Sequence, residues 1–144
     1  MSLSMTKAER DEFLAGLHVG VISIEQTDAS PIAVPIWYDY APDVGVWILT
    51  AEESVKGQAL QAAERFTLCA QEETPPNYRY VSVEGPVIEV RPADREKDSR
   101  PMAQRYLGEQ LGNLYTDSEG GEASLVFTMR PERWRTVDYS KLGS

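Results

Sequence analysis

The segment Pro31–Lys56 constrains the fold most, because two alternating strands there lead directly into the start of a helix. Along Pro31–Tyr40 every second residue is apolar, which predicts a strand with one buried face. That face carries Ile32, Val34, Ile36, Tyr38 and Tyr40. A second alternating strand, Val44–Thr50, follows a Pro-Asp turn. We therefore place these two strands at the centre of the fold.

Ser54 is suited to cap a helix that continues to about Glu64. The first amides of a helix have no partners within the helix, and they attract anions. Lys56, two residues further on, adds a positive charge. The combination predicts a phosphate site, although an ordinary helix start with a surface lysine has the same pattern.

The rest of the chain is predicted to form short strands and two further helices. We expect a helix over Lys7–Leu17, capped by Thr6, and a second one capped by Ser99, with a first helical turn before it at Ala93–Asp98. The first buries Phe13, Leu14 and Leu17; the second has an apolar stripe of Tyr106, Leu107, Leu111 and Leu114. The remaining strands are His18–Gln26, Phe66–Glu72, Tyr78–Arg91, Ser124–Met129 and Arg133–Tyr139. A polar, Gly-rich loop is expected over Thr116–Glu122, as the segment most prone to disorder.

The strand Tyr78–Arg91 contains Gly85-Pro86, a pair typical of a bend that lets one strand serve two sheets. Short, alternating strands joined by hairpin-length turns predict a mainly β (α+β) protein whose antiparallel sheet closes into a barrel of six or seven strands. We assign residues 5–142 to a single domain and interpret residues 1–4 as a cloning remnant.

Composition narrows the classes of function. The formal charge of −9 argues against non-specific nucleic-acid binding, and no apolar run is long enough to span a membrane. Because the chain has one cysteine and one histidine, we expect no internal disulfide and no metal site. Cys69 and His18 are interpreted as structural residues in a cytoplasmic protein. No Ser-His-Asp set, P-loop or Gly-rich dinucleotide motif is evident.

Six aromatic residues could lie in the core, at a dimer interface or against a bound ring: Trp37, Tyr38, Trp47, Tyr78, Tyr80 and Trp134. The order Val34-Pro35-Ile36-Trp37-Tyr38, then a strand ending in Thr50, then Ser54-x-Lys56, resembles the pyridoxamine 5′-phosphate oxidase-like, FMN-binding split β-barrel family. The resemblance continues in Arg65–Ala70 and in Tyr78–Gly85, and it covers Phe13 to about Val90.

The resemblance implies a homodimeric split β-barrel with its cofactor in a groove at the subunit interface. Residues along the flavin ring would be Ile36, Trp37 and Tyr38, with Leu49 and Thr50 along the ribityl chain and Ser54 and Lys56 at the phosphate. The last hairpin of the partner subunit would add Trp134, together with Arg133 or Arg135.

The resemblance also implies a flavin oxidoreductase that transfers hydride to or from a small molecule, with no catalytic side chain required. Vitamin B6 oxidation is not expected, because the chain ends Asp138–Leu142 without the family's His-Arg substrate motif. One alternative is a reductase that uses the 8-hydroxy-5-deazaflavin coenzyme, whose acidic tail Arg79 or Arg130 could bind. A non-catalytic flavin-binding protein is the other; a haem-binding branch would require a better placed histidine than His18.

Overall fold

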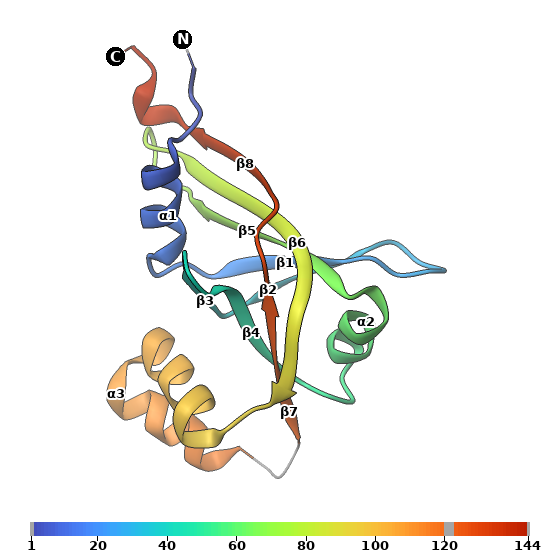
Figure 1. The fold of residues 1–144 in the computed structure, drawn as a ribbon. Coiled ribbons are helices and arrows are strands. Elements are labelled where there is room, and N and C mark those ends of the chain that lie inside the picture. Colours follow the sequence, from blue (N-terminus) through green and yellow to red (C-terminus); the bar gives the residue numbers. More distant parts are fainter. Residues whose placement is uncertain (1, 120–122, 144) are drawn as a thin grey trace.

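A computed structural model describes residues 2–119 and 123–143 of the chain. In this part of the chain, eight strands form a curled antiparallel sheet, with three α-helices around it (Figure 1). The strands are β1 Gly20–Ile24, β2 Ile32–Ile36, β3 Tyr38–Ala41, β4 Gly45–Ala51, β5 Arg65–Glu72, β6 Arg79–Pro92, β7 Ser124–Met129 and β8 Arg133–Asp138. The helices are α1 Lys7–Ala15, α2 Val55–Ala63 and α3 Arg100–Ser118, with a π-helix η1 Arg95–Ser99 and a 3-10 turn η2 Tyr139–Lys141. The antiparallel split-barrel fold class is confirmed.

The long strand β6 joins the two halves of the sheet, whose order is β2-β1-β5-β6-β7-β4-β3. Its first part pairs with β5 and β8, and its second part pairs with β7. The register shifts between Val87 and Glu89, directly after the predicted bend. Gly85 is needed there, because a Cβ would lie 1.8 Å from the carbonyl oxygen of Arg130.

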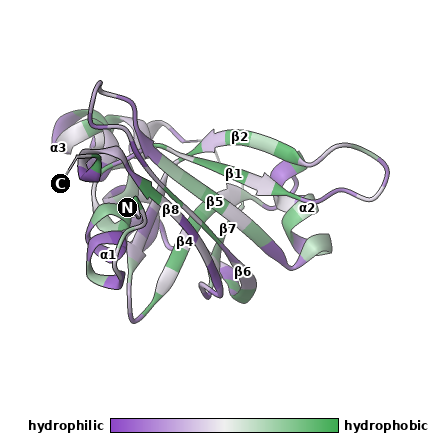
Figure 2. Ribbon diagram, turned by 90° about the horizontal axis from the view of Figure 1, so that it is seen from above, coloured by the Kyte–Doolittle hydropathy of each residue, from purple (hydrophilic) through white to green (hydrophobic). Residues whose placement is uncertain are grey.

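The alternation seen in the sequence produces the core. Ile36, Tyr38 and Tyr40 are buried, as are Val46 and Ile48 on the next strand. Figure 2 shows the resulting hydrophobic stretches along the central strands β1, β5 and β7. The predicted strand Pro31–Tyr40 is divided at Trp37, however, because β2 pairs with β1 whereas β3 pairs with β4.

Two predictions about the first helix and the last helix's start were wrong. Helix α1 ends at Ala15, and Leu17 is 59% exposed rather than buried. Ser99 makes no side-chain cap; Asp94 instead accepts the amides of Glu96 and Lys97, and the helical chain begins at Arg95 as η1, inside the predicted helical turn Ala93–Asp98. None of the described helices is both long and apolar enough to cross a membrane.

The predicted apolar stripe of α3 is also wrong. Gly108 has φ 83° and ψ 171°, which is not helical, and it divides α3 into two arms. Leu111 and Leu114 are therefore 57% and 64% exposed, whereas Met102, Ala103, Gly112 and Thr116 are buried. The helix continues to Ser118, so Thr116–Ser118 is not a loop; residues 120–122 of that predicted loop lie outside the described residues.

Candidate functional site

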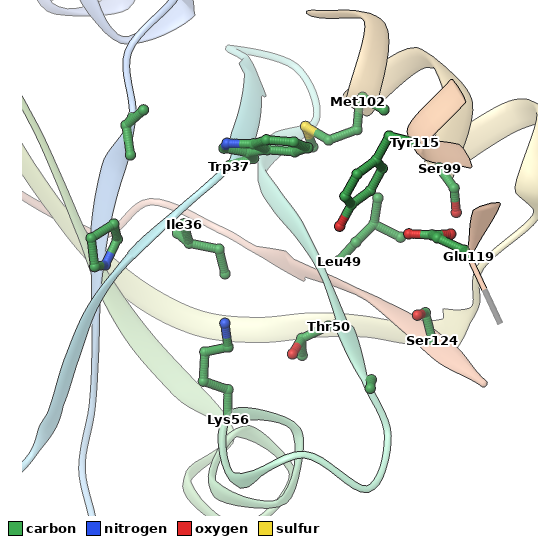
Figure 3. A pocket seen from close by; sticks show the side chains of 14 residues that line it. Ile36, Trp37, Leu49, Thr50, Lys56, Ser99, Met102, Tyr115, Glu119 and Ser124 are labelled. Atoms are coloured by element: carbon green, nitrogen blue, oxygen red, sulfur yellow. The ribbon is translucent and has the colours of Figure 1, made fainter. Parts of the chain in front are cut away.

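A cavity of about 450 Å³ lies between the end of β2, β4, the start of α2 and helix α3 (Figure 3). This volume is within the range of about 300–1,000 Å³ that is usual for small-molecule pockets. Five of the predicted site residues line it: Ile36, Trp37, Leu49, Thr50 and Lys56. Segments far apart in the sequence thus form one site.

The start of α2 forms the polar end of this pocket. The Ser54 hydroxyl accepts the Gly57 N–H (3.0 Å) and donates to Ala51 O (2.7 Å), which confirms the predicted cap. The buried Thr50 hydroxyl lies 3.1 Å from the Ser54 hydroxyl. A Cβ on Gly57 would be 2.2 Å from Ala51 O, so glycine allows the helix to begin against the end of β4. Ser54 itself supports the pocket without lining it.

The ammonium group of Lys56 points into the pocket toward Ile36 (Figure 3). Within the described part of the chain, Lys56 makes neither a side-chain hydrogen bond nor an ion pair. Glu52 and Glu53 do not line the pocket, and the lining carboxylate, Glu119, lies on the α3 side. The positive charge of Lys56 is therefore available to an anion.

The opposite wall is apolar and aromatic. Ile36, Trp37 and Leu49 form this wall together with Met102 and Tyr115 of α3, which lie beside Trp37 (Figure 3). No site residue was predicted in α3. Gly108 and Gly112 are the signals that could have indicated a broken helix there, because Gly112 packs closely against Gln104 of the first arm.

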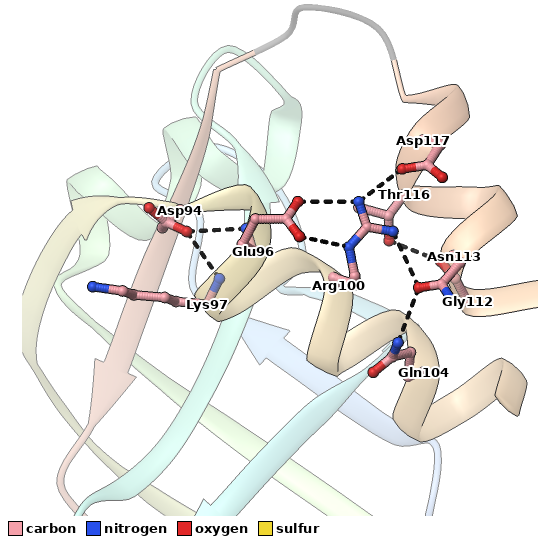
Figure 4. Close-up of polar contacts among 9 residues, drawn as sticks. All are labelled: Asp94, Glu96, Lys97, Arg100, Gln104, Gly112, Asn113, Thr116 and Asp117. Atoms are coloured by element: carbon pink, nitrogen blue, oxygen red, sulfur yellow. Dashed lines mark hydrogen bonds and ion pairs between the residues drawn. The ribbon is translucent and has the colours of Figure 1, made fainter. Parts of the chain in front are cut away.

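A polar network clamps the two arms of α3 together (Figure 4). Arg100 donates to both carboxylate oxygens of Glu96 (2.9 and 3.0 Å), to Asp117 (2.7 Å) and to Asn113 (3.1 Å). Asn113 also accepts the side-chain amide of Gln104 (2.9 Å). This clamp fixes the spacing of the α3 residues that reach the pocket.

Besides Ser54, two more predicted residues lie outside the pocket. Tyr38 is fully buried, its hydroxyl donates to Leu14 O (2.7 Å), and burial raises its pKa. Trp134 on β8 packs edge-on against Tyr40, and the Arg10 guanidinium lies 4.2 Å from the centre of its ring. In this protomer both side chains belong to packing, and neither reaches the cavity.

The residues proposed for an acidic coenzyme tail are also elsewhere. Arg79 is paired with Glu72 and lies over the Phe13 ring of α1, and Arg130 is paired with Glu132 (3.3 Å). Neither lines the pocket, which leaves Lys56 as its one basic residue in the described chain.

Neither the histidine nor the cysteine of the chain lines the pocket. His18 lies outside it; its Nε2 is 2.9 Å from Phe13 O, and burial lowers its pKa. Burial raises the pKa of the Cys69 thiol, which also lies outside the pocket. Among the described residues, no group of three or more His, Cys, Asp or Glu side chains could hold a metal ion. The arrangement suits binding of a ligand that has a flat apolar body and an anionic end.

Comparison with known proteins agrees with this architecture. The family described as pyridoxamine 5′-phosphate oxidase matches residues 6–138. A conserved hypothetical protein from Mycobacterium tuberculosis is similar over 99% of this chain and 90% of its own, with TM-score 0.78 and 22% identity. An F420 reductase is similar over 87% of this chain and 94% of its own, with TM-score 0.68 and 16% identity. A FAD-binding protein from Mesorhizobium loti is similar over 94% of this chain and 96% of its own, with TM-score 0.62 and 15% identity. At these identities the likeness to solved structures shows the shared fold. No curated protein matched the sequence.

Proposed function

The chain belongs to the pyridoxamine 5′-phosphate oxidase family, and from this premise we propose that it binds FMN and acts as a flavin oxidoreductase on a small molecule. The observation that carries the proposal is Lys56: among the described residues its ammonium makes no hydrogen bond or ion pair, and it enters, at a helix start, a pocket that has one apolar, aromatic wall. A phosphate is suited to the cation and the free amides, and a planar ring is suited to the apolar wall.

The residues have separate roles in this proposal. Lys56 and the first amides of α2 would hold the phosphate, while Thr50 and Leu49 would lie along the ribityl chain. Ile36 and Trp37 would orient the ring, and Met102 would exclude water from it. A bound flavin supplies the hydride chemistry, so the protein needs to bind, orient and shield it.

The charge of the pocket favours FMN over the deazaflavin coenzyme. One lysine and a helix start can balance a single phosphate, whereas a longer acidic tail requires further cations. Arg79 and Arg130, the candidates for such a tail, are paired with carboxylates away from the pocket. An F420 reductase shares the fold, so the deazaflavin coenzyme is the competing ligand to test.

We also propose that the protein is a homodimer whose second subunit closes this pocket. Val19 and Tyr115 line the pocket yet remain 53% and 47% exposed, so its mouth is apolar. A second copy could cover this mouth and place Trp134 with Arg133 or Arg135 nearby. Light scattering after size exclusion would contradict this if the mass remained that of one chain at micromolar concentrations.

The test of function is a titration of the purified protein with FMN and, separately, with the deazaflavin coenzyme, followed by ligand fluorescence. We expect FMN to bind at one per protomer and more tightly than the deazaflavin. Tighter deazaflavin binding would transfer the proposal to that coenzyme, and binding of neither would overturn it. A panel of reduced nicotinamides and quinones then tests for redox activity. If bound FMN is neither reduced by the nicotinamides nor reoxidised by the quinones faster than free FMN, the protein is a flavin carrier and the proposed oxidoreductase activity is wrong.

A further inference from the structure

Trp37 occupies the point at which the chain leaves one half of the sheet for the other. Strand β2 ends at Ile36, and β3 begins at Tyr38 with a new partner strand. The backbone groups of Tyr38 turn toward α3 at this break: its N–H donates to the Tyr106 hydroxyl (3.1 Å), which lies 3.0 Å from Tyr38 O. A side chain of α3 thus takes the place of a strand partner.

The same hydroxyl also reaches the segment before β1. It donates to His18 O at 2.5 Å, so a single oxygen connects the backbone at His18 with that at Tyr38. Burial raises the pKa of Tyr106, and the hydroxyl therefore keeps its proton at neutral pH. These contacts hold the Tyr106 ring at a fixed position relative to the break.

The ring of Tyr106 in turn packs on Trp37. The two ring planes differ by 4° and their centres are 5.1 Å apart, while Tyr115 meets the indole at 54° and 5.5 Å. In the part of the chain that the structure describes, the indole N–H of Trp37 has no hydrogen-bond partner. The orientation of this pocket wall therefore depends on ring contacts.

Helix α3 has a second attachment that does not involve Tyr106. The Arg105 guanidinium donates to Ala15 O (3.2 Å) and Gly16 O (2.9 Å) at the end of α1. Substitution of Tyr106 should consequently leave α3 in place while it releases the indole.

We propose that Tyr106 is a positioning residue that holds the Trp37 indole as the ring-binding wall of the pocket. The ligand that benefits is the flavin ring, so this part of the inference rests on the proposed function. Tyr106 does not itself line the pocket, and it acts through Trp37.

The test uses full-length protein labelled with 5-fluorotryptophan, which gives one fluorine resonance for each of the three tryptophans. Trp37→Phe assigns the relevant signal. In Tyr106→Leu we expect the Trp37 resonance to shift and those of Trp47 and Trp134 to stay. Tyr106→Phe keeps the ring without its tether, so its Trp37 resonance should lie between those of the wild type and the leucine variant. Tyr139→Phe, at a 46% exposed position, is the control and should change none.

With FMN present, Tyr106→Leu should raise Kd about fivefold, the scale of one lost aromatic pair, and change the visible circular dichroism of bound flavin. The phenylalanine variant should recover most of the affinity. An unchanged Trp37 resonance, or equal changes in all three, would overturn the inference. If Trp37 responds as expected but the wild type binds no FMN, the proposed function fails and the role of Tyr106 stands.

Discussion

Replacing Gly57 by alanine should damage the fold and the site together. The added Cβ would lie 2.2 Å from Ala51 O and 2.9 Å from Glu52 O, and both are backbone atoms. Forcing such contacts costs about 3 kcal/mol at the upper end of overpacking effects. Alanine regains about 1 kcal/mol over glycine within a helix. We therefore expect the free energy of unfolding to fall by about 2 kcal/mol, the difference of these two terms.

Urea denaturation measures this loss, and a 2 kcal/mol change should lower the midpoint by about 1 M for an m-value of about 2 kcal/mol/M. Ala62→Gly, at an exposed position of α2, is the matched control. It should lose about 1 kcal/mol from helix propensity alone and leave FMN affinity unchanged. Gly57→Ala should also weaken FMN binding, because α2 must move away from β4. A Gly57→Ala protein as stable as the wild type would refute the packing argument.

Three further perturbations test the surroundings of the pocket. Ser54→Ala removes the cap of α2 and should cost about 1 kcal/mol in urea denaturation. Arg100→Met opens the clamp between the arms of α3 and should weaken FMN binding in fluorescence titrations, whereas Arg95→Met, an exposed change on η1, should not. Asp98 accepts two hydrogen bonds from Arg91, which lower the pKa of its carboxyl group below 3.8. The stabilising contribution of the Asp98 carboxylate is therefore present above pH 3.8, and it is lost as the pH falls through the lower pKa of the folded protein. The stability gap between wild type and Asp98→Asn should accordingly narrow in denaturation curves below pH 3.8.

The polar end of the pocket could be predicted from sequence because its determinants are local. Alternation along β4 indicates which of the side chains of Leu49 and Thr50 faces the core. The Ser54 cap fixes where α2 begins. Once the start of α2 is fixed, helix geometry determines where Lys56 lies in its first turn. The phosphate-site prediction depends on these neighbours alone.

The part of the aromatic wall that α3 contributes could not be predicted in the same way because it depends on long-range contacts. Gly108 interrupts the helix, so residues before and after it do not lie on one continuous helical face. The predicted stripe therefore combines Tyr106, which packs on Trp37, with Leu114, which is exposed. The change of strand partners at Trp37 also has no local signal, since the alternation continues through it. The family resemblance places Tyr38 along the ring, whereas the alternation places it on the buried face, and its side chain is in the core.

The most direct test of the account compares Lys56→Ala with the wild type for two ligands, FMN and riboflavin, which differ by the phosphate. Loss of a charge-assisted phosphate contact should weaken FMN binding by about 1.5–3 kcal/mol. Riboflavin affinity should remain the same, and Lys97→Ala, at an exposed lysine of η1, should affect neither ligand. Unchanged FMN affinity in Lys56→Ala, or an equal loss for both ligands, would contradict the assignment of the phosphate to the start of α2.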